Sequence, residues 1–172
     1  MAGALRAAGW VVPPIEGELS GEFTAIKLEG APTLRWTIVA RAKGAGARDF
    51  NLKIDGAGTR LVVRGVIDAK GNGTWSVVEG ELEAAQWFPS AQTQIGEMAA
   101  GVAVTGTVEM SGGGVIDAGA LRGVMRIEWK DGGVRHEADG WTLEGVSFAG
   151  EFAIDTEKGT IESTLPLGVV VP

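Results

Sequence analysis

The side chain with the widest range of chemistry in this sequence is its single histidine, His136, which lies between Arg135 and Glu137. A histidine beside a carboxylate can act as a general base, because its pKa lies near neutrality. A Ser–His–acid site would combine His136 with one of several serines that no motif singles out. The chain has no cysteine, which excludes thiolate nucleophiles, disulfides and Cys-ligated metal sites. We therefore interpret His136 as a solvated or hydrogen-bonded strand residue.

Two rows of carboxylates have the spacing of one strand face, because residues two apart point to the same side. They are Glu16, Glu18 and Glu22, and Glu79, Glu81 and Glu83. Two carboxylates across a cleft hydrolyse glycosides, so a glycan-cleaving jelly roll that uses Glu79 or Glu81 is one hypothesis. Calcium needs six or more oxygens, and no loop carries a dense Asp-x-Asp-x-Asp pattern. The simpler interpretation is the solvated outer face of a sheet, and we expect no metal, no cofactor and no catalytic residues.

The chain contains six tryptophans and no tyrosine. Trp36, Trp75 and Trp129 lie in predicted strands, and Trp10 and Trp141 lie near strand starts. A row of exposed tryptophans would stack on sugar rings, whereas buried ones fill a core. We favour the core, or the lining of an apolar groove.

Period-two alternation of apolar and polar residues is the strongest pattern in the chain, and it predicts antiparallel strands. The alternation is clearest in the segments 34–41, 50–55, 61–67, 74–83, 102–108, 121–130, 134–138, 141–146, 151–154 and 160–165. The fold class that follows is all-β: a meander that forms a curved, twisted sheet, either a half-barrel or a sandwich. One face of that sheet is apolar and the other is charged.

Glycine-rich segments predict where the strands turn, since glycine and asparagine adopt positive φ cheaply. Turns are expected at 68–73 and at 112–114, and Asp131-Gly132-Gly133 predicts a hairpin. One short helix is expected from Pro89 to Ala100, capped by Ser90. Ile95, Met98 and Ala99 would form its apolar stripe.

Composition limits the partners of the protein. The net charge is −7, from 22 acidic and 15 basic residues, which argues against nucleic acid and against anionic lipid head groups as non-specific partners. The 28 glycines in 172 residues fit many short strands joined by tight turns. No apolar run reaches the ~18 residues of a membrane-spanning helix, and the first residues lack the pattern of a signal peptide.

An internal similarity divides the chain into two units. Leu34-Arg35 and Ile67-Asp68 recur as Leu121-Arg122 and Ile154-Asp155, 87 residues later in both cases. A repeated set of strands predicts an extended sheet that is built by duplication of one unit and works as a surface. We expect a lead-in at 1–14, a first β unit at 15–88, a helical linker at 89–101 and a second β unit at 102–172, sharing one domain.

The second half of the chain resembles bacterial envelope proteins of the AsmA/TamB-like superfamily, in particular the YdbH type. The resemblance rests on segments with Gly-x-aliphatic pairs, namely 105–110, 119–123, 141–146 and 150–154, and on Trp87-Phe88-Pro89 between the two units. It implies an elongated half-barrel with an apolar groove, periplasmic and anchored in the inner membrane, that moves phospholipid and has no catalytic residues. The apolar ending of the chain fits an excised fragment of such a protein.

Our leading hypothesis is a non-enzymatic envelope segment whose apolar sheet face binds or conducts lipid acyl chains between membranes. The residues expected to line that face are Leu34, Trp36, Ile38, Phe50, Leu52, Ile54, Met125, Ile127 and Trp129. The alternative is a carbohydrate- or protein-binding β-sandwich of an exported protein. A structural or adhesive domain remains a third interpretation.

Overall fold

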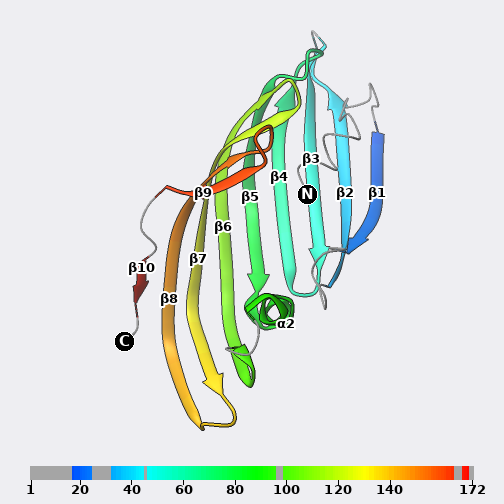
Figure 1. Ribbon diagram of the computed structural model, residues 1–172. Coiled ribbons are helices and arrows are strands. Elements are labelled where there is room, and N and C mark those ends of the chain that lie inside the picture. Colours follow the sequence, from blue (N-terminus) through cyan, green and yellow to red (C-terminus); the bar gives the residue numbers. More distant parts are fainter. Residues whose placement is uncertain (1–16, 25–31, 45, 96–98, 165–167, 171–172) are drawn as a thin grey trace.

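The protein is an open antiparallel meander with one helix, seen in a computed structural model that describes residues 17–24, 32–44, 46–95, 99–164 and 168–170 (Figure 1). The strands are β1 (Gly17–Thr24), β2 (Thr33–Ala42), β3 (Arg48–Gly56), β4 (Thr59–Ile67), β5 (Gly73–Glu83), β6 (Val102–Asp117), β7 (Ala120–His136), β8 (Trp141–Asp155), β9 (Thr160–Ser163) and β10 (Gly168–Val170). The helix α2 (Ala84–Ile95) connects β5 to β6. The predicted all-β class is confirmed.

Each of the first eight strands pairs with the next one along the chain, and β9 and β10 both pair with β8. The described strands thus form one sheet that does not close on itself, rather than the two packed sheets of a sandwich. Sequential antiparallel pairing of this kind needs only short connections. The predicted lead-in at 1–14 lies outside the described residues.

Two hairpins have two-residue loops of the type I′ kind, with positive φ at both positions. Ala57 and Gly58 join β3 to β4 with φ of 47° and 67°, and Ala118 and Gly119 join β6 to β7 with φ of 48° and 86°. The predicted turn at 68–73 is also present. There the Asp68 carboxylate accepts hydrogen bonds from the backbone N–H groups of Lys70 and Asn72, each at 2.8 Å.

Asp131-Gly132-Gly133 does not form the predicted hairpin. It lies inside β7, where the register against β8 shifts on both sides of Gly132. Asp131 has φ of 50°, so the positive φ suggested by the sequence is present, but it makes a bulge in a continuing strand. Gly106 in β6 and Gly145 in β8 also have positive φ, 105° and 71°, and lie beside it across the sheet. The three neighbouring strands β6, β7 and β8 therefore all have an irregular backbone at the same height in the sheet.

The glycines at 112–114 were also expected to turn, and they too lie inside a strand, β6. Gly112 pairs with Met125 and Val77, and Gly114 pairs with Trp75 and Gly123. A Cβ on Gly114 would lie 1.9 Å from the carbonyl oxygen of Arg122, so the strands approach too closely here for any side chain. The run of glycines serves close strand packing beside large residues on the neighbouring strands.

The helix begins five residues earlier than predicted. Because α2 starts at Ala84, Pro89 lies inside it and Ser90 cannot be its N-cap. Ser90 is instead the most buried side chain of the described chain, at 2% exposure. Of the predicted apolar stripe, Ala99 is buried, whereas the side chains of Ile95 and Met98 lie outside the described residues.

The 87-residue similarity does not relate equivalent elements. Its first copy spans the three strands β2, β3 and β4, whereas its second copy spans only β7 and β8. Gly46 lies in the connection between β2 and β3, but its counterpart Gly133 lies within β7. The repeated Leu-Arg and Ile-Asp pairs do mark strand starts and ends, and Asp68 and Asp155 both accept backbone hydrogen bonds in the following turn.

The buried core is small for a chain of this length. It centres on Ile67, Trp75 and Ile116, from β4, β5 and β6. Phe50, Val63, Val77 and Met125 pack around them and stay partly exposed. Among the described elements no second sheet covers the apolar side of this one, so most of its apolar residues are only half-buried.

Candidate functional site

The strand register gathers the apolar residues of eight strands on one face of the sheet. Directly opposite residues of antiparallel strands point to the same side, and such pairs include Leu34 with Phe23, Ile38 with Leu52, Met125 with Phe152, and Trp129 with Phe148. We call this side the apolar face. From β1 to β8 its large side chains are Leu19, Phe23, Leu34, Trp36, Ile38, Phe50, Leu52, Ile54, Leu61, Val63, Ile67, Trp75, Val77, Leu82, Val102, Val104, Val108, Met110, Ile116, Leu121, Met125, Ile127, Trp129, Val134, Trp141, Leu143, Val146, Phe148, Phe152 and Ile154.

All nine side chains that the sequence predicted for this face lie on it. Leu34 is buried at 5% exposure, and the other eight, from Trp36 to Trp129, are partly exposed. Their role as lipid contacts stays a prediction. The structure brings them into one surface because β2 and β3 connect through β4, β5 and β6 to β7 without a break in pairing.

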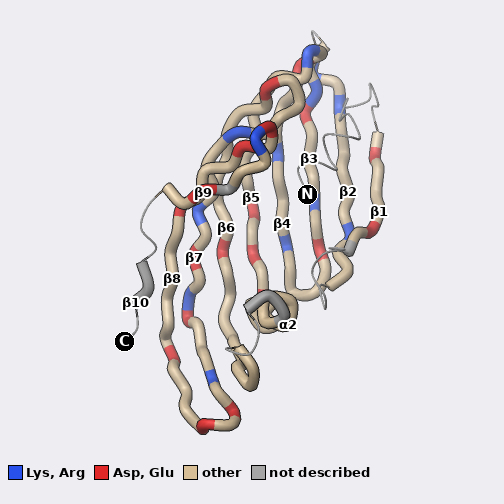
Figure 2. The backbone as a smooth tube through the Cα atoms, in the orientation of Figure 1, with Lys and Arg blue, Asp and Glu red and all other residues tan. Residues whose placement is uncertain are grey.

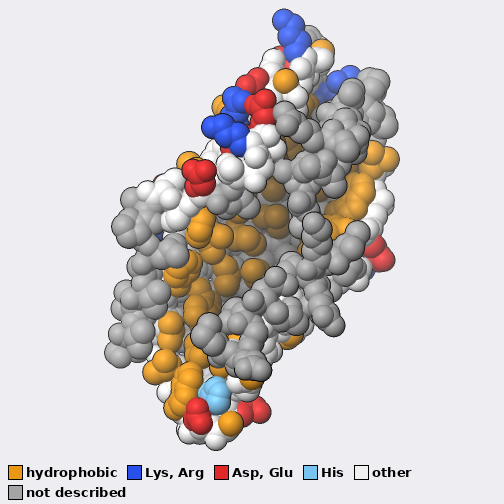
Figure 3. Space-filling view, viewed as in Figure 1, with side chains coloured by type: hydrophobic (Ala, Val, Ile, Leu, Met, Phe, Trp, Pro, Cys, Tyr) orange, Lys and Arg blue, Asp and Glu red, His pale blue; other side chains and the backbone are white. Residues whose placement is uncertain are grey.

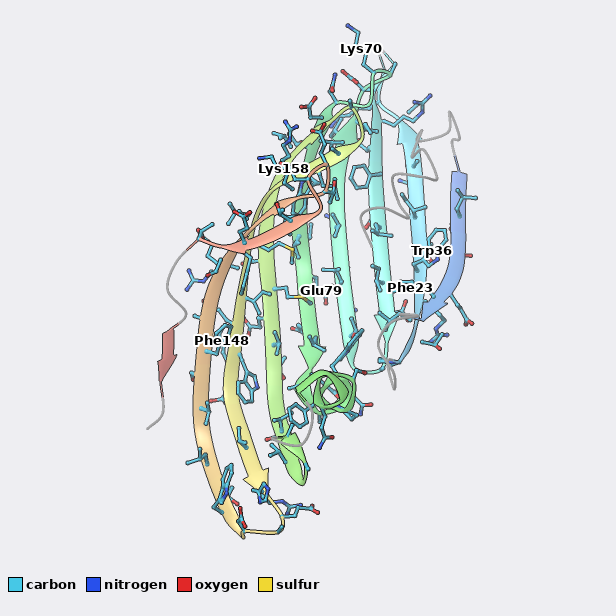
Figure 4. The ribbon with its side chains drawn as sticks, viewed as in Figure 1. Phe23, Trp36, Lys70, Glu79, Phe148 and Lys158 are labelled. Atoms are coloured by element: carbon cyan, nitrogen blue, oxygen red, sulfur yellow. The ribbon has the colours of Figure 1, made fainter. Side chains whose placement is uncertain are left out.

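The most exposed parts of the apolar face lie at its two sides, and of their four residues all but Trp141 were missed by the sequence analysis. Leu19 and Phe23 of β1 are 45% and 43% exposed, and Trp141 and Leu143 of β8 are 41% and 42% exposed. Figure 3 shows hydrophobic side chains gathered over β7 and β8 and again beside β1. Phe23 and Trp36 lie at one side of the sheet, and Phe148 lies at the other (Figure 4). Alternation in 19–23 and 141–148 was the signal that could have identified them.

Aromatic rings on this face lie against glycines, either on a neighbouring strand, as with Phe50 and Gly65, or on the same strand, as with Trp129 and Gly132. A Cβ on Gly65 would be 2.4 Å from Cζ of Phe50, and one on Gly132 would be 2.6 Å from the indole of Trp129. The Trp129 indole also covers Gly106 and donates a hydrogen bond to the Thr105 carbonyl at 3.0 Å. An aromatic ring that packs flat over a glycine leaves a flat apolar surface, and it shields the glycine backbone from solvent.

Charged residues are nearly absent from the apolar face. Among the described strands, the register places no Asp, Glu or Lys on it between Leu19 and Ile154, and Arg48 and His136 lie at strand ends. The register places the charged side chains of the strands on the opposite side, the polar face. Figure 2 marks the positions of these charged residues along the strands. A molecule seated on the apolar face would therefore meet hydrocarbon and aromatic groups along its whole length.

Ion pairs between neighbouring strands cover much of the polar face. Arg60 in β4 contacts Glu79 in β5 at 3.0 Å, and Lys130 in β7 contacts Glu109 in β6 at 2.6 Å. Both partners of each pair are substantially exposed, so each contributes little to stability.

The carboxylate row Glu79, Glu81 and Glu83 lies on the polar face, as do Glu18 and Glu22 of the other row, whereas Glu16 is outside the described residues. Glu81 lines a shallow depression of about 400 Å³ together with Glu109 and Glu128. The hydrogen bond from Lys130 lowers the pKa of Glu128, with Arg126 adding to the effect. A general acid needs a raised pKa, so this shift does not favour Glu128 as the acid of a glycoside hydrolase. Among the described residues, no cluster of His, Asp and Glu has the geometry of a metal site.

His136 has structural partners at both ring nitrogens. Nδ1 accepts a hydrogen bond from the Asp139 backbone N–H at 3.1 Å, and Nε2 lies 3.1 Å from the Ala100 carbonyl. The Asp139 carboxylate also lies 3.2 Å from Nδ1. The ring also stacks on Trp141, with centroids 5.7 Å apart. His136 thus ties the β7–β8 hairpin to the start of β6.

The helix α2 lies against one end of the apolar face. Its Trp87 indole donates a hydrogen bond to the Thr59 hydroxyl at 2.7 Å, and Thr59 belongs to the face at the start of β4. Figure 1 shows the helix beside the end of β5, with the long strands β6 to β8 extending past it. The helix covers one corner of the apolar face, and the rest of this face lies beyond the reach of α2.

Within the part of the chain that the structure describes, no helix has the length and apolar character to cross a bilayer. Comparison of the chain with protein-family models, with curated proteins and with solved structures finds no match. The geometry of the site therefore supplies the functional argument.

Proposed function

We propose that this protein is a non-enzymatic lipid-binding segment whose apolar face holds the acyl chains of phospholipids. The observation that supports the proposal is the broad apolar face of an open sheet, on which the register places no Asp, Glu or Lys and the one arginine, Arg48, lies at a strand end. A sheet face of this kind must be covered by another layer or by a ligand. The only helix among the described elements, α2, covers one corner.

The width of the face suits extended hydrocarbon chains. From β1 to β8 the sheet has seven spacings between strands, which at about 4.8 Å each give roughly 34 Å. This is comparable to the ~30 Å hydrocarbon core that two opposed acyl chains fill in a bilayer. A chain laid across the strands would contact several of them at once.

Binding would be driven by burial of apolar surface, at about 0.8 kcal/mol for each buried CH₂ group. Leu19, Phe23, Trp141 and Leu143 remain about half exposed without a ligand and would gain most. Because the face offers no charged group between its ends, it would select for hydrocarbon and not for a particular head group. Such a surface suits the passage of lipids of mixed type.

The setting that we propose is the bacterial cell envelope, on the periplasmic side, where this chain would be one part of a longer membrane-anchored protein that conducts lipid between membranes. The support is the resemblance of the strand segments to AsmA/TamB-like proteins, together with an open apolar sheet that suits such a conduit. Lipid binding by the segment itself can be tested without knowing the parent protein.

The test uses purified protein and phosphatidylcholine with brominated acyl chains, which quench tryptophan fluorescence on contact. Trp36, Trp129 and Trp141 lie on the apolar face, so binding should quench the emission in a saturable manner. Native mass spectrometry of the same sample should show phospholipid adducts. Absence of both saturable quenching and adducts would contradict the proposal.

A matched pair of variants tests whether the lipid binds to the apolar face or to the polar face. Leu143→Glu places a charge on the apolar face at a residue that is 42% exposed, so the fold should tolerate it. Thr142→Glu places the same charge one residue away, on the polar face. We expect Leu143→Glu to weaken quenching and Thr142→Glu to leave it unchanged. Equal effects would indicate that binding does not involve the apolar face.

The carbohydrate-binding alternative has less support. Sugar recognition combines aromatic stacking with polar groups beside the ring, whereas the indole N–H groups of Trp87 and Trp129 are engaged within the protein, with Thr59 and Thr105. Glycan-array binding without any lipid quenching would favour that alternative.

A further inference from the structure

The polar face contains a second hollow, between β2 and β5, whose charge differs from that of its surroundings. This depression of about 760 Å³ is lined by Arg41, Lys53 and Arg64, from three successive strands, and by Thr74 and Ser76 of β5. Asn51 and Asp49 also line it, beside their register partners Val39 and Val66. We call it the cationic depression.

Its three cations have no carboxylate partners among the described residues. Elsewhere on the polar face, Arg35 lies 3.7 Å from Asp55, Arg60 3.0 Å from Glu79 and Lys130 2.6 Å from Glu109. Asp49, in the depression itself, pairs with Lys43 at 3.0 Å. Arg41, Lys53 and Arg64 make no such contact, although the chain carries a net charge of −7. With Asp49 counted as the one acid among the lining residues, the depression has an excess of two positive charges.

The register places these groups close enough to act together. Arg64 lies directly opposite Asn51 on one side and Ser76 on the other, and Lys53 is its diagonal neighbour on β3. Diagonal neighbours are about 7 Å apart at Cβ, within the reach of long side chains. Arg41 lies opposite Asp49 and is the diagonal neighbour of Asn51 from β2. The three cations thus border the same depression.

Like charges held this close repel one another, and an anion between them removes that repulsion. Arginine presents a planar fork that binds phosphate oxygens in pairs, and lysine adds a point charge. Hydroxyl groups such as those of Thr74 and Ser76 donate the remaining hydrogen bonds. We propose that the cationic depression is a binding site for a phosphoryl group, formed by Arg41, Lys53 and Arg64. The site is independent of the apolar face, which lies on the other side of the sheet.

Phosphoryl groups reach a protein as free phosphate compounds or as lipid head groups, and two probes distinguish these sources. The first is inorganic phosphate, titrated into the full chain by isothermal titration calorimetry at low ionic strength. The second is sedimentation with vesicles of phosphatidylcholine that contain phosphatidic acid, against vesicles of phosphatidylcholine alone. Binding of phosphate indicates a soluble ligand, and binding to the phosphatidic acid vesicles without binding of phosphate indicates a head group. Failure of both probes would overturn the proposal.

Two triple variants with the same change of charge test the residues. Arg41→Gln/Lys53→Gln/Arg64→Gln should weaken binding by more than about tenfold, because it removes all charge-assisted contacts. Arg35→Gln/Arg60→Gln/Lys130→Gln removes three paired cations from the same face and should keep the wild-type affinity. Equal loss in both variants would show non-specific attraction and overturn the site. If circular dichroism shows that the first variant is unfolded, Arg64→Gln alone should still weaken binding, and unchanged affinity would overturn the site.

Discussion

The indole of Trp36 in β2 lies directly against Gly21 in β1: a Cβ on Gly21 would be 2.9 Å from Nε1 and 3.0 Å from Cε2 of that ring. The two residues are register partners on the apolar face. The same arrangement recurs between Phe50 and Gly65, further into the sheet. The flatness of the apolar face thus depends on particular glycines, and this dependence can be measured.

Gly65→Ala should destabilise the protein by about 1–3 kcal/mol, as overpacking does in well-packed sites. The new Cβ would lie 2.3 Å from the Thr74 carbonyl oxygen and 2.4 Å from the Phe50 ring, so the backbone itself must move. Gly21→Ala should cost less, because its Cβ meets only the Trp36 side chain, which can rotate. Urea denaturation followed by circular dichroism measures both. An equal or larger loss for Gly21→Ala would contradict this account of the packing.

Ala57→Asn should stabilise the protein by up to about 1 kcal/mol, since asparagine tolerates the left-handed conformation better than alanine. Ala57 occupies the first position of the β3–β4 hairpin loop with φ of 47°, followed by Gly58. Asn-Gly is the preferred sequence for such a loop. The measurement is the midpoint of thermal unfolding, and a lower midpoint in the variant would show that the loop is not a type I′ turn.

Asp68→Asn and Asp155→Asn should make unfolding less sensitive to acid. The backbone N–H of Asn72 lowers the pKa of Asp68, and that of Lys158 lowers the pKa of Asp155, both from a usual value of 3.8. A carboxylate with a lowered pKa in the folded state stabilises the protein above pH 3.8, and this contribution is lost as the pH falls through the folded value.

The amide of asparagine can still accept the turn hydrogen bonds but does not titrate, so the variants isolate this effect. The free energy of unfolding, measured by urea at several pH values between neutral and pH 3, should fall less steeply in the variants than in the wild type. Asp131→Asn is the control, because Asp131 is exposed, makes no side-chain ion pair with the described residues, and has a positive φ that asparagine also tolerates. Identical slopes for the wild type and the two variants would contradict the proposed coupling.

Trp87→Phe should cost about 0.5–1.5 kcal/mol, the usual contribution of one hydrogen bond. The variant keeps an aromatic ring in α2 but removes the donor to the Thr59 hydroxyl. Thr59→Val removes the acceptor instead, and the double variant should cost clearly less than the sum of the two single variants. Additive losses would show that the contact between α2 and the apolar face does not contribute to stability.

Much of the fold could be predicted from the sequence, because period-two alternation reports which side of a strand each residue faces. Leu34, Trp36 and Ile38 share a face for that local reason, and so do Met125, Ile127 and Trp129. That the two groups belong to one surface depends on the pairing of β4, β5 and β6 between them, which is not a local property.

The tertiary structure decided what the glycine-rich segments do. Positive φ suits a tight turn and a bulge equally well, so Asp131-Gly132-Gly133 predicted a hairpin and became a bulge, because β6 and β8 continue to pair with β7 beyond it. Likewise, Pro89 and Ser90 fit the start of a helix locally, but α2 begins at Ala84, directly where β5 ends.

The charged residues show the same difference between what the sequence determines and what the tertiary structure decides. The sequence by itself determined that Arg41, Lys53 and Arg64 alternate with apolar residues and so face away from them. Only the pairing of β2, β3 and β4 decided that these three cations share one depression, while nearby cations of the same face meet carboxylates. Alternation fixes the side of a residue, whereas strand register fixes its neighbours, and a binding site requires both.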